Sequence, residues 1–363
     1  MSIDPFDTVA DATQRALAWA QQWLFESLIQ PAIYAAGLMR FQEEAFDATE
    51  WLVLGALEVT ALAIVLGLLQ RRFPAEPLRD RQAVRVDIVY TLLHRLGAFP
   101  LIAFALLTPV LDGLEARLRL IGFSRLNVDQ VLPGITDAPL ASFLIYLVTL
   151  DFCDYWIHRG QHRLRWWWAL HAVHHSQRQM TFWSDNRNHL LDDLLRDGLL
   201  AVVAILIGVG PGQFVMLTLA SRVLQSLQHA NLRWHFGALG ERLLVSPSFH
   251  RLHHAIGYGH EGRRQGCNFA VLFPLWDLLF GTADFRRGFV PTGIRDQLDG
   301  YDYGRGFWAQ QGLGLLRMTG LRPPQPAGPA GAASSVSSAG PAGAVGPAGP
   351  AGSAGPVTPE RRR

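Results

Sequence analysis

The sequence contains no lysine and few charged residues of any kind. All 32 basic side chains are arginines, and charged residues make up 17% of the 363, against roughly 25% in soluble domains. Hydrophobic residues reach 49%, and the mean hydropathy is +0.14. A formal net charge of +2 is too small to indicate a nucleic-acid partner. The low fraction of charged residues and the high hydrophobic fraction together favour a membrane protein.

Cysteine is also scarce. The two cysteines, Cys153 and Cys267, cannot supply a four-cysteine zinc or iron–sulfur site. The sequence has no Glu-x-x-His, which argues against a ferritin-type carboxylate di-iron bundle. It has no His-Glu-x-x-His either, which argues against a zinc protease. The N-terminus carries acidic residues where a signal peptide would be basic, so insertion is expected to depend on the helices themselves.

Three long apolar runs are candidates for spanning helices, which need about 20 residues. Trp51–Leu69 fits well, and Ile88–Leu107 fits although it contains His94 and Arg95. Pro139–Leu150 continues into polar sequence, so we expect its helix to leave the membrane. Residues 16–39 hold glutamines, a glutamate and a proline, and fit an interfacial helix as well as a span.

Two shorter apolar segments predict a helical hairpin. Leu194–Ile207 and Gln213–Leu227 flank a glycine- and proline-rich stretch typical of a turn, so the second segment should return to the side where the first began. The loop 70–86 carries five arginines, which indicates a cytoplasmic loop. Counting spans from that loop predicts that residues 158–175 and 229–254 also lie in the cytoplasm.

Histidines gather in three boxes within those two segments. His158–His162 is an HxxxH, whereas His171–His175 and His250–His254 are both HxxHH. On an α-helix, positions i, i+3 and i+4 fit within an arc of about 100°, so each box is expected to point its imidazoles toward one point. Imidazole suits iron, zinc, copper and nickel. Eight box histidines exceed the four ligands usual for one zinc, which predicts two metal ions.

The boxes, their order and their spacing resemble the fatty acid hydroxylase/sterol desaturase superfamily. The resemblance runs from about Asp151 to Thr282 and includes Asp154-Tyr-Trp-Ile-His-Arg159, Gln228-His-Ala-Asn231 and Asn268-Phe269. It implies a membrane-bound oxygenase with two non-haem iron ions, and the absence of lysine together with abundant Ala, Gly and Pro suggests a bacterial member. Such an enzyme activates O2 to hydroxylate or desaturate a sterol-like, fatty acyl or related isoprenoid lipid.

The resemblance also implies two further ligands outside the boxes, His189 and His229, although Leu190 stands where relatives often have proline. The expected metal ligands are therefore His158, His162, His171, His174, His175, His189, His229, His250, His253 and His254. Asp154 precedes His158 by one helical turn, so it either accepts a hydrogen bond from a ligand histidine or is a solvated carboxylate. Asp192 and Asp277 are weaker candidates for the same role, and Asn231 and Asn268 are also expected beside the ligands.

The predicted fold is all-α: an integral membrane helical bundle with a cytoplasmic, histidine-rich helical cap, multi-pass in the cell inner membrane. Glycine recurs at every third position from Gly340 to Gly355, and so short a repeat favours disorder over a collagen helix. The predicted parts are 1–47, an amphipathic or membrane helix; 48–138, transmembrane helices; 139–285, the catalytic domain; 286–320, a C-terminal extension; and 321–363, a disordered Gly/Pro/Ala tail.

Electrons are expected from another protein, because the chain has no cysteine cluster and no recognisable haem domain. A ferredoxin or a cytochrome b5-like protein with its reductase would fit, docking at the cytoplasmic face. Six arginines there could attract an acidic carrier or simply flank the spans: Arg159, Arg163, Arg165, Arg251, Arg263 and Arg264.

The alternative function is a non-catalytic membrane metal-binding or metal-transport protein. Transport predicts charged or polar ligands near the middle of the bilayer. The boxes follow the apolar runs instead of lying within them, so the pattern favours the oxygenase.

Overall fold

The computed structural model describes residues 5–123, 131–132, 134, 138–209, 211–262 and 265–321. The predicted disordered tail, apart from Leu321, lies outside the described residues, as do Arg263 and Arg264. The described residues form helices and loops, with two isolated β-bridges and no strand. The prediction of an all-α fold is confirmed.

The elements follow one another from a mainly helical N-terminal half to a shorter, loop-rich C-terminal part. The first are α1 (Pro5–Leu24), η1 (Phe25–Ile29), α2 (Gln30–Ala35), η2 (Met39–Phe41), α3 (Gln42–Arg72), α4 (Arg81–Arg95), α5 (Ala98–Leu120), α7 (Pro139–Arg163) and α8 (Arg165–His175). The rest are η4 (Phe182–Asn186), α9 (Leu190–Ile207), α10 (Pro211–His229), α11 (Gly237–Leu243), α12 (Pro247–His253), α13 (Leu275–Leu279), η5 (Arg295–Asp299) and α14 (Phe307–Met318).

Three helical segments are long and apolar enough to cross a membrane: Met39–Arg72, Ala98–Leu120 and Pro139–Arg163. Their apolar side chains are largely exposed, as Leu57 and Leu68 illustrate on α3 at 54% and 58%. Such a surface is stable in contact with acyl chains and costly in water. Residues 16–39, which include a π-helical turn and a short helix, contain no such segment.

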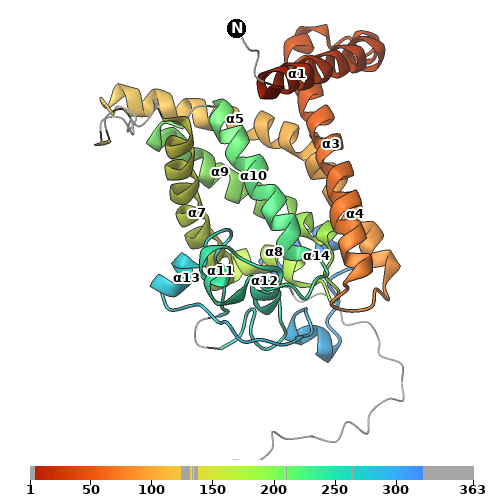
Figure 1. Ribbon diagram of the computed structural model, residues 1–363, viewed down its shortest axis with the longest axis vertical. Coiled ribbons are helices and arrows are strands. Elements are labelled where there is room, and N and C mark those ends of the chain that lie inside the picture. The colour runs from red at the N-terminus through yellow and green to blue at the C-terminus, as the bar shows by residue number, and fades with distance from the viewer. Residues whose placement is uncertain are drawn as a thin grey trace, which may run out of the picture. The chain divides into compact units, whose positions relative to one another are not determined.

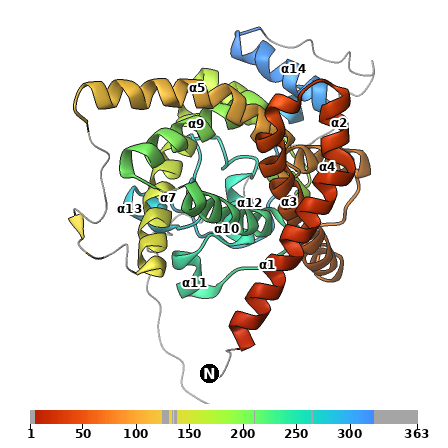
Figure 2. The same cartoon turned by 90° about the horizontal axis from the view of Figure 1, so that it is seen from above.

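The prediction of one continuous span over Ile88–Leu107 is wrong. α4 ends at Arg95, and Gly97 takes a left-handed φ of 90° before α5 begins, a conformation that glycine adopts without strain. α4 packs closely on α3, where a Cβ on Gly55 would lie 1.7 Å from the carbonyl oxygen of Arg95. α5 then packs against α9 and lies along one edge of the bundle when it is seen from above (Figure 2).

The arginine-rich segment 70–86, which joins the end of α3 to the start of α4, lies at the same end of the bundle as the histidine boxes. Asn231, just beyond α10, accepts a hydrogen bond from Glu76 N at 3.0 Å and donates one to Glu76 O at 2.8 Å. Gln70 accepts hydrogen bonds from the backbone of Phe182 and Asn231. α9 and α10 form the predicted hairpin, with Gly208 left-handed at the end of α9. In Figure 1, α8, α12 and α14 accordingly lie at the lower end of the long helices.

Candidate metal centre

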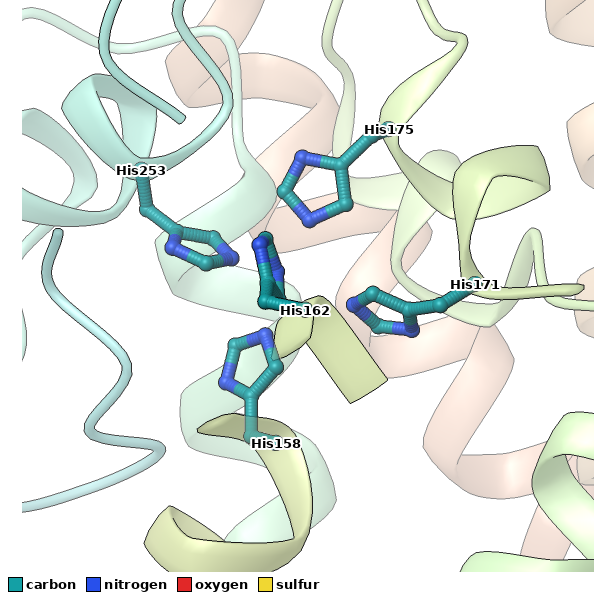
Figure 3. Close-up of side chains that lie close together, drawn as sticks. All are labelled: His158, His162, His171, His175 and His253. Carbon is teal, nitrogen blue, oxygen red and sulfur yellow. The ribbon is translucent and has the colours of Figure 1, made fainter. Parts of the chain in front are cut away.

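Nine buried histidines form two adjoining groups at this end of the bundle. The first group contains His158, His162, His171, His175 and His253, and the second contains His174, His229, His250 and His254. Within each group the ligand nitrogens all lie within 4.8 Å of one another, and no member is more than 7% exposed. Figure 3 shows the five rings of the first group turned toward a common centre.

The groups meet where His175 and His254 stack, with ring centroids 4.4 Å apart. Each HxxHH box contributes to both groups: His171 and His175 join the first, whereas His174 joins the second. The prediction that each box points to one place is therefore wrong. Positions i and i+4 are about 40° apart around a helix, while i+3 lies about 60° to the other side of i. The first and last histidines of a box can therefore point to one group while the middle histidine points to the other.

Backbone carbonyls and a carboxylate hold three rings of the first group by Nδ1. His158 donates to Phe269 O at 2.8 Å, His253 to Cys267 O at 2.7 Å, and His171 to Asp192 Oδ2 at 2.9 Å. In each case Nε2 is buried and has no hydrogen-bond partner among the described residues. A neutral imidazole that donates through Nδ1 keeps a lone pair on Nε2, and that is the arrangement of a metal-ligating histidine.

In the second group the Nε2 atoms face one another. His229 Nε2 lies 3.3 Å from His174 Nε2 and 3.1 Å from His250 Nε2, and His254 Nε2 lies 3.1 Å from His250 Nε2. Nitrogens that bind one metal ion at about 2.1 Å are separated by about 3.0 to 3.4 Å in octahedral or tetrahedral geometry. The spacing therefore fits a metal coordination sphere. His229 is oriented for this because its Nδ1 donates to Gln225 O at 2.9 Å.

Burial keeps these imidazoles neutral. Loss of solvation, and then the neighbouring imidazoles, lower the pKa of His174, His175, His250 and His254 well below the usual value. Burial also lowers the pKa of His253 to about 3, against an opposing hydrogen bond to Cys267 O. Because metal ions bind the unprotonated ring, the electrostatics of both groups favour a cation at their centres.

Asp192 is the carboxylate that orients a clustered histidine directly. Besides His171, it accepts hydrogen bonds at 2.7 Å from Gln161 Nε2 and Trp167 Nε1. Asp154, predicted for this role, instead binds Arg196 through both carboxylate oxygens. The hydrogen bond from Asp154 to a ligand histidine that the sequence suggested is absent among the described residues.

Asn268 and Asp277 act on the backbone beside the first group. Asn268 has a φ of 57° and donates to Phe249 O and Asp284 O, both at 2.9 Å. It thereby fixes the turn between the Cys267 and Phe269 carbonyls. Asp277 accepts hydrogen bonds from the backbone N–H groups that follow Asn268, at 2.8 and 2.9 Å, and burial raises its pKa to about 6. Asn231 contacts the α3–α4 loop and no clustered histidine.

His189 lies outside both groups. Its Nε2 donates to Gln311 O at 3.0 Å, and its Nδ1 accepts from Leu191 N at 3.1 Å, at the start of α9. Both ring nitrogens are therefore occupied by the protein. A Cβ on Gly314 would lie 2.6 Å from the His189 ring, so this histidine docks α14, and we leave it out of the ligand set.

Two aromatic residues beside the first group were not identified from the sequence as neighbours of the metal ligands. The ring of His260 stacks on Trp168 at 3.4 Å and lies 5.6 Å from that of His162. Burial lowers the pKa of His260 to about 4. No local pattern marks His260, because the turn that carries it reaches Trp168 only through the tertiary fold.

The arginines suggested for carrier attraction differ in their surroundings. Arg163 and Arg165 are exposed, whereas Arg251 is buried and forms an ion pair with Glu76. Arg159 donates to the Tyr155 hydroxyl at 3.2 Å. The exposed pair is therefore free to act at long range, whereas Arg251 has a structural partner.

Two cavities adjoin the histidines. A small one of about 60 Å3 is lined by members of both groups, among them His158, His171, His174, His229 and His250. A larger one of about 370 Å3 lies next to it, between α5, α7, α9 and α10. The pair provides a confined space at the histidines and room beside it for a larger molecule.

Comparison with known proteins places the histidine groups within a recognised domain. Residues 143–282, which contain all nine clustered histidines, match the family described as fatty acid hydroxylase. An ornithine lipid hydroxylase of Rhizobium tropici is 27% identical over 260 residues, or 70% of this chain and 74% of that protein. Alkylglycerol monooxygenases of Caenorhabditis elegans and Homo sapiens are 29% and 26% identical over 42% and 46% of this chain. These matches span 28% and 36% of the two monooxygenases. No solved structure matches.

Proposed function

We propose that this chain, whose residues 143–282 match the fatty acid hydroxylase family, is a membrane-bound di-iron oxygenase that uses O2 to oxidise a lipid. The observation that carries the proposal is the pair of adjoining groups of buried histidines whose ring nitrogens converge within each group. The matched relatives are a lipid hydroxylase and alkylglycerol monooxygenases, which supports a lipid substrate.

Two iron ions account for the number and division of the histidines. Five ligand nitrogens in one group and four in the other exceed what one ion accommodates, and each group has its own centre. Bound iron supplies the activation of O2 and the oxidation of an unactivated C–H bond. In hydroxylation, one oxygen atom enters the C–H bond and the other leaves as water, with two electrons and two protons supplied from outside.

The chain itself positions the ligands and limits access of water. Asp192 and the carbonyls of Cys267 and Phe269 fix the orientation of three imidazoles, so that the ligand lone pairs are preorganised. The 60 Å3 cavity confines O2 and the reacting carbon beside both groups. A lipid chain would lie in the larger cavity, against the apolar side chains of α5.

We further propose that the histidine groups face the cytoplasm from the inner membrane. The loop 70–86 is rich in arginine, and short arginine-rich loops are retained in the cytoplasm. The hydrogen bonds between Glu76 and Asn231 support a position of the histidine groups on the same side as that loop.

Electrons for the reaction would come from a separate acidic protein, a ferredoxin or a cytochrome b5-like carrier. The described residues have no strand, and the one Gly-x-Gly-x-x-Gly pattern, Gly257–Gly262, lies in the turn after α12, not between a strand and a helix as in dinucleotide-binding folds.

A basic groove of about 440 Å3 is our candidate docking site for that carrier. Its lining includes Arg233, Arg242, Arg251, Arg286 and Arg287, against the carboxylates of Glu241 and Asp284. The exposed ring of Phe289 also lines it. Arg251 belongs to α12, the helix that carries His250 and His253, so an acidic carrier in the groove would lie one helix away from both groups.

Charge reversal at the groove tests the docking site. Arg287→Glu, at an exposed position, should raise KM for the carrier severalfold at low salt, with the difference shrinking as ionic strength rises. Turnover driven by a chemical reductant should not change. Arg117→Glu, exposed on α5, is the matched control. Equal KM values for the two variants would rule out the groove.

The oxygenase itself is tested on purified protein reconstituted with iron in detergent. We expect about two irons per chain and incorporation of labelled O2 into a lipid only when reductant is present. His175→Ala and His250→Ala, one from each group, should each abolish product. Metal flux across proteoliposomes without O2 consumption would instead establish the transport alternative.

A further inference from the structure

The larger cavity beside the histidines is apolar on one part of its wall and charged on another. Phe104, Leu107 and Leu111 of α5 and Leu147 of α7 line the apolar part. Six polar residues line both this cavity and the small one at the histidines: Asp154, Asp185, Asn188, Asp193, Arg196 and Gln225. A substrate that reaches the histidines from the larger cavity must therefore pass a polar, charged wall.

Most charges on that wall already have partners. Arg196 pairs with Asp154, its Nε lying 2.8 Å from Oδ1. Arg95 lies 2.7 Å from Asp185 and also contacts Glu58, and the other oxygen of Asp185 is 3.6 Å from Nδ1 of His229. These ion pairs stabilise the wall, and their charges are satisfied without a substrate.

Arg222 on α10 differs from these charged residues because its side chain has no ion-pair partner among the described residues. Arg222 lines the cavity, yet its side chain forms no hydrogen bond or ion pair within the described part of the chain. Arg95 repels it through space, whereas Asp197, Glu58 and Asp185 attract it. An arginine without a contacting anion in an apolar bundle is costly and marks a substrate site by default.

Asp197 on α9 provides the complementary charge. It lines the same cavity, its side chain is 41% exposed, and its one ion pair is a loose 3.7 Å contact with Arg196. Arg222 and Asp197 thus present a cation and an anion to the cavity without contacting each other. Two separated opposite charges of this kind are complementary to a zwitterion.

The position of Arg222 along α10 places this charge near the histidines. Arg222 lies seven positions before His229 on α10, a separation of about 10 Å along the helix axis. Seven positions are nearly two full turns, so both side chains lie on one face of the helix. A headgroup bound at Arg222 would hold its own atoms, or the first carbons of the attached chain, at the histidines, and would keep the chain terminus away.

We propose that the substrate is a lipid with a zwitterionic headgroup, its anionic group bound by Arg222 and its ammonium group held near Asp197, and that oxidation takes place in or beside that headgroup. This inference rests on the proposed function. The anionic group could be the carboxylate of an amino-acid lipid or the phosphate of a phospholipid, since a guanidinium binds both.

The test compares kcat/KM of the iron-loaded protein on four lipids in mixed micelles. Ornithine lipid carries carboxylate and ammonium, phosphatidylethanolamine carries phosphate and ammonium, phosphatidylglycerol carries only an anion, and alkylglycerol is uncharged. One of the two zwitterions should exceed the last two lipids at least tenfold, and the preferred zwitterion identifies the anion. Fragmentation of the product should locate the oxygen in the headgroup or the adjoining carbons.

Variants connect this preference to the two residues. Arg222→Gln and Asp197→Asn should each lower kcat/KM for the preferred zwitterion at least tenfold, with iron content unchanged. Arg222→Lys should retain most of the activity, and Arg117→Gln serves as the control for loss of an arginine.

Direct measurement of binding of the same lipids tests the headgroup site separately from the proposed oxygenase activity. If no lipid is oxidised but Arg222→Gln weakens zwitterion binding tenfold, the proposed oxygenase fails and the headgroup site stands. If alkylglycerol is oxidised as fast as the zwitterions and neither variant changes kcat/KM, the oxygenase stands and the headgroup site is refuted.

Discussion

Nδ1 of His171 lies 2.9 Å from Oδ2 of Asp192, and this contact links the metal centre to the packing of three helices. The other carboxylate oxygen accepts hydrogen bonds from Gln161 on α7 and Trp167 on α8, while Asp192 itself belongs to the first turn of α9. One carboxylate therefore contacts α7 and α8, the helices that carry four of the five histidines of its group.

Replacing this carboxylate should weaken metal binding. Asp192→Asn keeps the shape of the side chain but removes the negative charge that orients His171, so we expect iron affinity to fall about ten- to a hundredfold. Iron retained against a graded series of chelator concentrations measures the change. Asp299→Asn, at an exposed position on η5, should retain iron like the wild type. If both variants lose iron equally, the orienting role of Asp192 is wrong.

Asn268 should matter for the shape of the turn more than for any ligand bond. Asn268→Ala removes the hydrogen bonds to Phe249 and Asp284 and places alanine at a φ of 57°. We expect a loss of about 2 to 4 kcal/mol of stability, most of it from the unsatisfied buried groups. Asn268→Gly relieves the backbone strain alone and should recover about 1 kcal/mol. Thermal unfolding in detergent compares the stabilities of the two variants and the wild type. Equal melting temperatures for the two variants would show that the positive φ at residue 268 does not strain alanine.

His189 provides a histidine-to-alanine comparison outside the metal centre. His189→Ala should retain full iron content, because both ring nitrogens bind protein groups. It should cost about 1 to 2 kcal/mol through the lost cap of α9 and the lost contact with α14. His175→Ala, in the first group, should lose iron. The two variants are compared by metal analysis and by melting temperature, and iron loss in His189→Ala would return this residue to the ligand set.

The sequence was sufficient to predict the all-α fold, the hairpin and eight of the nine clustered histidines from box spacing alone. These features are local, because helical periodicity and apolar length are encoded within one segment. His229 required the family resemblance, since a single histidine at the end of a helix carries no pattern. The same resemblance suggested His189, which the structure places outside both groups, with partners Gln311 and Gly314 that lie far along the chain.

The features that could not be predicted depend on contacts between distant segments. The break between α4 and α5 follows from the burial of Arg95 against Glu58 and Asp185, which hydropathy cannot anticipate. The division of each HxxHH box between two groups depends on how α8 and α12 face one another. The choice of Asp192 over Asp154 as the carboxylate on a ligand likewise depends on the position of Arg196.

Removal of the metal should destabilise the protein reversibly. Without cations, nine imidazoles remain buried, and eight of them have at least one ring nitrogen without a hydrogen-bond partner among the described residues, which is costly in a low-dielectric interior. Because a metal ion that binds only the folded state stabilises it by mass action, chelation should lower the melting temperature and added iron should restore it. Zinc, which also takes imidazole ligands but has no redox chemistry, should restore the melting temperature without restoring lipid oxidation. A melting temperature insensitive to chelator, in protein shown to have lost its iron, would mean that the two groups are stable without metal ions.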